Sequence, residues 1–211
     1  LLTDCAEIRP HAPAPYYQMS LIAKQMNELD EAVKYGEKAV KYGPDNKWYR
    51  IHLANIYLNE QSLDSALIQY ESLVKKNEVH EMDILFRLAQ LYQKNDKYQQ
   101  ALEYYNEIEK RVGVNARISE LKKMIYAKIG EKEKAYQEIQ KLIDKYPDDA
   151  RYYGMLAELY ATFEEYDKAE KMYNKLFEID STYNLGQMSL VKYNNQKDQT
   201  GKALDTYINK V

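Results

Sequence analysis

The sequence predicts an all-α protein, built as a solenoid of stacked antiparallel helix pairs. Three observations carry this prediction. Six alanines recur along the 211 residues at spacings of 34 or 35, apolar residues recur every three or four positions in two blocks of each period, and glycine (7) and proline (5) are scarce. Each block reads as a helix of about 14 residues, roughly 21 Å long.

The alanine series sets the phase of the repeat. It comprises Ala32, Ala66, Ala101, Ala135, Ala169 and Ala203. A small side chain at a helix crossing lets two backbones approach, and large neighbours fill the flanks. Much of the tyrosine excess (22 of 211) follows the same phase, and four residues after the alanine stand Tyr70, Tyr105, Tyr173 and Tyr207. We therefore expect both residue types to pack between helices.

Taken in order, the elements form five full repeats flanked by two partial ones. Residues 1–12 read as the second helix of a preceding repeat, and residues 184–211 as an incomplete sixth repeat. The full repeats are 13–46, 47–81, 82–115, 116–149 and 150–183, all within one solenoid domain. Because the chain starts and stops inside repeats, we expect a piece of a longer array. Its uncapped end face is a candidate for end-to-end self-association.

Two places depart from the regular pattern. The single spacing of 35 puts one extra residue near 77–82. In the fourth repeat, Lys122 and Lys123 occupy the positions where the other repeats place an apolar and a small residue. Long lysine side chains can extend to reach water, so we expect this repeat to pack less well than its neighbours.

The fifth repeat carries the most specific pattern, YYGMLAELYATFEEYDKAEKMYNKLFEID at 152–180. At these residues the chain resembles the tetratricopeptide repeat (TPR) family, and its Lys-, Asn- and Tyr-rich texture is similar to that of bacterial TPR arrays. The resemblance implies a right-handed superhelix whose first helices line a concave groove. It also implies a protein-interaction scaffold that binds a peptide or protein segment there.

The free arc of each first helix supplies the candidate binding residues. At 100° per residue, positions 2, 5, 9 and 12 fall within about 80°, away from the packing positions. Aromatic, arginine and methionine side chains are frequent at binding hot spots and adaptable surfaces. With their neighbours at position 6, the candidates are Tyr17, Trp48, Ile51, His52, Asn55, Phe86, Arg87, Gln90, Arg117, Met124, Arg151 and Glu158. Packing against the next first helix is the alternative role for each of them.

Some functions are disfavoured by the residues present. A clamp for chaperone tails, as the family resemblance would define it, needs lysines at position 5, and none stands there. A net charge of −3 argues against a nucleic-acid partner, and no apolar run is long enough for membrane insertion. The second functional hypothesis is a regulatory or sensor segment of a larger multidomain protein.

Catalytic and cofactor chemistry is not expected. The three histidines lie far apart without metal-ligand spacing, and no glycine-rich phosphate loop occurs. The one cysteine, Cys5, falls on a packing position, which favours a buried inert thiol. We expect a soluble non-enzyme without metal or other cofactor. Its compartment is the cytoplasm or, with slight preference, the periplasmic side of a bacterial cell envelope.

Overall fold

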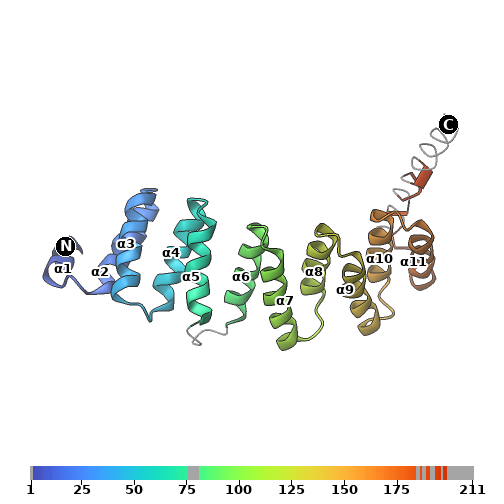
Figure 1. The fold of residues 1–211 in the computed structure, drawn as a ribbon, viewed down its shortest axis with the longest axis horizontal. Helices are drawn as coiled ribbons and strands as arrows, with labels where there is room; N and C mark the ends of the chain where they lie inside the picture. The colour runs from blue at the N-terminus through green and yellow to red at the C-terminus, as the bar shows by residue number, and fades with distance from the viewer. Residues whose placement is uncertain are drawn as a thin grey trace. The chain divides into compact units, whose positions relative to one another are not determined.

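The computed structural model describes residues 2–75 and 81–183, and beyond them residues 186, 189–190, 193–195 and 197–198. Helices are the only regular elements among these residues, which confirms the predicted all-α fold of stacked helix pairs. Figure 1 shows the helices along the chain. The chain divides into two compact units, Leu1–Ile108 and Glu109–Val211.

The first unit opens with a short helix, α1 (Leu2–Ile8), and continues with helix pairs. The pairs are α2 (Pro13–Gln25) with α3 (Leu29–Tyr42), α4 (Lys47–Asn59) with α5 (Leu63–Lys75), and α6 (Met82–Lys94) with α7 (Tyr98–Val112). Helix α3 also packs against α4, and α5 packs against α6, so consecutive pairs stack on one another. The last turn of α7 belongs to the second unit.

The second unit repeats the arrangement. It contains α8 (Ala116–Lys128) paired with α9 (Lys132–Lys145), and α10 (Ala150–Thr162) paired with α11 (Tyr166–Ile179). Helix α9 packs against α10 as the next pair begins. The second helix predicted for the incomplete sixth repeat lies outside the described residues, as does most of the segment with the extra residue.

The alanine series forms the centre of each helix pair. Its five described members have no exposed surface: Ala32, Ala66, Ala101, Ala135 and Ala169. Larger apolar side chains fill the space around them, and in the second unit Ala135 packs in one cluster with Ile139, Leu142 and Leu156. The small residues therefore allow the close helix crossings that the sequence predicts.

In the turn within each helix pair, one residue adopts the left-handed backbone conformation, with positive φ. It stands five residues before the series alanine, at Asn27, Gln61, Asp96, Gly130 and Glu164, with φ between 54° and 79°. In this region the Cβ of a non-glycine residue crowds the backbone. Only Gly130 avoids that cost, so the other four turns retain conformational strain that the packing of the flanking helices offsets.

Tyrosine hydroxyls join successive repeats. Tyr57 on α4 donates to Glu37 on α3 at 2.8 Å, and Tyr92 on α6 donates to Glu71 on α5 at 2.5 Å. Each bond connects the second helix of one pair to the first helix of the next. Burial, followed by the hydrogen bond to the carboxylate, raises the pKa of both tyrosines above the ordinary value. The periodic tyrosines thus contribute polar as well as apolar contacts.

Candidate functional site

The predicted site residues divide between the two units. Those on α2, α4 and α6 form what we call the first-helix face of unit 1: Tyr17, Trp48, Ile51, His52, Asn55, Phe86, Arg87 and Gln90. The remaining four, on α8 and α10, belong to unit 2: Arg117, Met124, Arg151 and Glu158.

Trp48 is the most exposed large apolar side chain of the first-helix face, at 59 %. It stands in the first turn of α4, where the Asn46 side chain accepts a hydrogen bond from its backbone N–H at 3.0 Å. The Lys47 Nζ lies 5.0 Å from the indole centroid and also pairs with Glu81. A capped helix start therefore presents the tryptophan to solvent beside a paired cation.

Tyr17, on α2, belongs to the same face and is half-buried. Its ring centroid is 4.9 Å from that of Tyr49 and 5.1 Å from that of His52, the second contact being edge-on. Such aromatic contacts hold a ring in one orientation. Tyr17 therefore has part of its surface in the packing between α2 and α4 and part available at the face.

His52 lies beneath the face rather than on it. Its side chain is 8 % exposed, and Nε2 is 2.9 Å from the Ser20 hydroxyl on α2. Burial first, and then the charge of Lys24, lower the pKa of the imidazole below its ordinary value. Among the predicted site residues, His52 has surroundings that suit packing between helices and not direct contact with a partner.

Tyr70, a residue that the sequence did not mark as part of the site, contacts Asn55 and feels the charge of Arg87. The Tyr70 hydroxyl, on α5, donates to Asn55 Oδ1 over a long 3.4 Å. Burial raises the pKa of Tyr70, while the charge and hydrogen bonding of Arg87 oppose that rise. The phenol, only 4 % exposed, thus bonds Asn55 on α4 and lies within electrostatic range of Arg87 on α6. The sequence signal that could have identified Tyr70 is its place in the periodic tyrosine series, four residues after Ala66.

Phe86 on α6 also packs against a tyrosine of the second helix of its pair. Phe86 is half-buried, and its ring meets that of Tyr105 on α7 edge-on at 6.0 Å. The Tyr105 hydroxyl donates to Gln93 Oε1 at 3.0 Å. Ile51 and Gln90 are also half-buried, whereas Arg87 is exposed. The face of unit 1 is therefore an apolar surface, partly buried, with an exposed tryptophan and an exposed arginine.

In unit 2, Met124 is 52 % exposed and Arg117 is exposed on α8. Arg151 is bound within the chain, since its Nη2 lies 2.6 Å from Asp149 Oδ2 and its Nε lies 2.9 Å from Asp149 Oδ1. It lines a cleft of about 850 Å³ beside the α9–α10 loop. Glu158 accepts a hydrogen bond from the Ser189 hydroxyl. Because Arg151 and Glu158 already have partners, a ligand would have to compete with those contacts.

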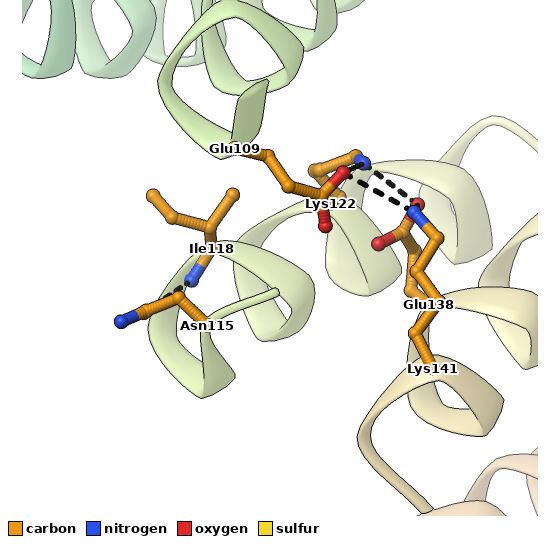
Figure 2. A network of polar contacts seen from close by, with 6 residues as sticks. All are labelled: Glu109, Asn115, Ile118, Lys122, Glu138 and Lys141. Atoms are coloured by element: carbon orange, nitrogen blue, oxygen red, sulfur yellow. Dashed lines mark hydrogen bonds and ion pairs between the residues drawn. The ribbon is translucent and has the colours of Figure 1, made fainter. Parts of the chain in front are cut away.

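A network of charges, in which Lys122 and Glu138 are buried and Lys141 is partly exposed, holds α8 in unit 2 (Figure 2). The Lys122 Nζ lies 2.8 Å from Glu109 Oε2 of α7 and 2.8 Å from Glu138 Oε1 of α9. Lys141 lies 3.2 Å from the same Glu109 oxygen and 3.0 Å from the same Glu138 oxygen. The four side chains, which we call the charge quartet, alternate in sign around a ring.

The charge quartet corrects one expectation from the sequence. Lys122 is 1 % exposed, so its side chain does not extend to water but turns inward. Burial raises the pKa of Glu109, but hydrogen bonds and charges from Lys122 and Lys141 outweigh it and the net pKa is lowered. Glu109 Oε1, Glu138 Oε2 and the Ser119 hydroxyl have no protein partner. Buried charges are stable only when opposite charges and hydrogen bonds compensate them. Each member of the charge quartet therefore depends on the other three.

Within the described part of the chain, no group of three His, Cys, Asp or Glu side chains is arranged to hold a metal ion. No described helix combines the length and apolar character that a membrane span requires.

Comparison with family models decides what this repeat is. One model described as a tetratricopeptide repeat matches residues 14–46 and 150–183, and another with the same description matches residues 86–150. The chain belongs to the tetratricopeptide repeat family. Both matching models are TPR models, and neither indicates an enzymatic family.

A curated relative agrees with this membership. The TPR repeat-containing protein MJ1428 of Methanocaldococcus jannaschii is 30 % identical over 132 residues, which are 63 % of this chain and 23 % of that protein. The chain therefore spans about a quarter of the relative's length.

Solved TPR structures share the fold. A tetratricopeptide repeat protein from Parabacteroides merdae aligns with a TM-score of 0.62 at 18 % identity, covering 92 % of this chain and 76 % of the other. YrrB, described as a TPR protein with an unusual peptide-binding site, aligns with a TM-score of 0.58 at 19 % identity, covering 89 % and 96 %. At these identities the likeness concerns the fold alone.

Proposed function

We propose that this TPR chain is a non-catalytic interaction scaffold that binds a peptide segment on the first-helix face of unit 1. The TPR fold itself suggests a protein-interaction scaffold. The observation that carries the finer proposal is the 59 % exposure of Trp48, the only tryptophan of the chain. An exposed indole costs solubility and gains binding energy when a partner covers it.

The chemistry around Trp48 indicates how a segment would be held. Half-buried Tyr17, Ile51 and Phe86 offer apolar contacts without needing to leave their packing positions. Asn55, bonded by the Tyr70 hydroxyl, offers a side-chain amide, and exposed Arg87 offers a guanidinium, to the carbonyl groups or carboxylates of a peptide. The peptide-binding description of YrrB gives this proposal support by analogy of fold.

A displayed library of random peptides tests the proposal. Peptides selected on the intact chain would be measured against Trp48→Ala and Arg87→Ala, with Ile68→Ala as the matched control. Ile68 is also 59 % exposed, but it lies on α5, a second helix. We expect an affinity loss of about 30-fold for Trp48→Ala, the size typical of a hot spot, and little change for Ile68→Ala.

The melting temperature and helicity of each variant separate binding from folding. Equal affinity losses for Ile68→Ala and Trp48→Ala, or unchanged affinity for Trp48→Ala, would exclude this face as the binding site. Three further hypotheses stay predictions from the sequence. They are a regulatory role within a larger protein, end-to-end self-association and a location in the cell envelope.

A further inference from the structure

A chain of hydrogen bonds ties α4 to α2 and α3 through His52. The Ser20 hydroxyl lies 2.6 Å from the Ala32 carbonyl, which can only accept, so the hydroxyl donates its proton there. The same oxygen, 2.9 Å from His52 Nε2, must then accept from the ring. The ring of His52 therefore carries a proton on Nε2, and Nδ1 is the nitrogen that a second proton would occupy.

The space around this chain of bonds is tight. Gly36 on α3 faces it, and a Cβ at that position would lie 3.2 Å from the Ser20 hydroxyl and 3.1 Å from Leu53 Cδ1. Ser20 has no exposed surface. The edge-on contact with Tyr17 covers another side of the imidazole. Little room is left for hydration of a charged ring.

The charges facing His52 do not favour a second proton. From α2, Lys24 contributes a positive charge. From α3, the Glu37 carboxylate accepts the hydroxyl of Tyr57, and from α5 the titratable Tyr70 donates to Asn55. On α4 itself, Tyr49 lies against Tyr17. None of these described contacts places a carboxylate against the imidazole.

We infer that His52 makes the packing of α2 against α4, and with it the position of Tyr17 on the first-helix face, sensitive to pH. Protonation of the ring puts a second cation near Lys24 in a buried site and adds an N–H on Nδ1 that needs an acceptor. The charged form is better hydrated when α2 moves away. Below neutral pH, α2 therefore separates from α4 more often.

The sign follows from linkage. Burial and Lys24 hold the pKa of His52 below its ordinary value of 6.5. The unfolded or opened form therefore binds the proton more readily than the closed form. The stabilisation by His52 is complete above about pH 6.5 and is lost as the pH falls through that value toward the lower folded pKa.

Thermal melts at about pH 7.5 and about pH 5.5 test the inference with the whole chain. The variants are His52→Gln, whose amide keeps a donor for Ser20 but does not titrate, and His11→Gln as control for an exposed histidine. We expect the wild type and His11→Gln to lose on the order of 2–4 °C in melting temperature between the two pH values. We expect His52→Gln to lose clearly less. Amide hydrogen exchange in α2 and the emission of Trp48 on α4 follow the same comparison.

A second measurement does not depend on the variant folding. Titration of the His52 imidazole by NMR in the wild type should give a pKa below 6.5, with faster exchange in α2 over the same pH range. A pKa at or above 6.5, or the same pH dependence in His52→Gln and wild type, would overturn the inference. The pH dependence of His52 is separate from the proposed peptide binding. Because these measurements use no ligand, their failure would not affect the proposed function, and failure of peptide binding would not affect the pH dependence.

Discussion

The Nζ of Lys122 lies 2.8 Å from Glu109 Oε2, although the lysine side chain has almost no access to water. The contact connects the last turn of α7 to the middle of α8, and Glu138 on α9 binds the same ammonium group. Lys122 is thus the more deeply buried of the two cations in the charge quartet. It stands at the position where other repeats of this chain have leucine, such as Leu88 and Leu156.

Lys122→Met should destabilise unit 2 by about 3 kcal/mol, because removing one partner leaves buried carboxylates without enough positive charge. Urea denaturation followed by circular dichroism measures the loss. Lys123→Met, at the half-buried neighbour, is the matched control and should change stability by less than about 1 kcal/mol. Adding Glu138→Gln to Lys122→Met should restore part of the loss. Equal stability of the two single variants would contradict the structural role of the quartet.

Glu164→Gly should stabilise the protein by about 1 kcal/mol. Glu164 turns the chain between α10 and α11 at φ 62°, where glycine has no steric cost, and the larger entropy of glycine in the unfolded chain cancels part of the gain. Gly130→Ala is the reverse experiment at φ 79° and should destabilise by a similar amount. Melting curves of both variants give the answer, and changes of the same sign would refute the argument.

Stability should fall as the pH rises above about 10. Burial first, and then hydrogen bonding to Glu37, Glu71 or Glu165, raises the pKa of Tyr57, Tyr92 and Tyr136 in the folded state. A raised folded pKa means that the stabilisation is complete below the unfolded pKa and is lost above it. Absorbance of tyrosinate and helicity should be recorded in one titration. Ionisation of all tyrosines before any helix is lost would show that these bonds do not stabilise the fold.

Asn115→Ala should cost about 1 kcal/mol, because the Asn115 side chain accepts hydrogen bonds from the N–H groups of Arg117 and Ile118 at the start of α8. Figure 2 shows the bond to Ile118. Asn115→Asp keeps an acceptor and is expected to retain most of the stability. Thermal melts and amide exchange in the first turn of α8 measure the effect. Equal melting of the alanine and aspartate variants would mean that the cap contributes nothing.

The repeat and its packing could be predicted because they depend on spacing alone. A residue that must sit at a close helix crossing has to be small in every copy, so Ala66 and Ala101 carry the period openly. The same reasoning predicted the two helices of each repeat and the exposure of Trp48, whose position falls outside the packing stripe. Local periodicity is enough for such features.

The site was harder to predict because its contacts depend on side-chain reach between helices. His52 stands beside the free arc, but the small Ser20 opposite leaves a space that the imidazole fills. The Tyr70 hydroxyl reaches Asn55 from another helix, a path that no wheel of α4 alone reveals. Arg151 is different, since its partner Asp149 is only two residues away and could have been recognised as a helix cap.

Lys122 shows the remaining limit. Its expected exposure was wrong because a lysine at an apolar position can also be satisfied by carboxylates from two other helices. Those partners stand 13 and 16 residues away, at positions that read as ordinary surface in the sequence. Only the packing of the last turn of α7 and of α9 against α8, all within unit 2, brings them together.

The tyrosine–glutamate bonds between neighbouring repeats have a mechanical consequence. Tyr57 to Glu37 and Tyr92 to Glu71 span 20 and 21 residues, so neither bond bridges more than one repeat length. In an array held by neighbour contacts, each helix pair can detach while those behind it keep their own contacts. A stretching force applied to one end should therefore extend the molecule in a series of small steps, each releasing about 34 residues of unfolded chain.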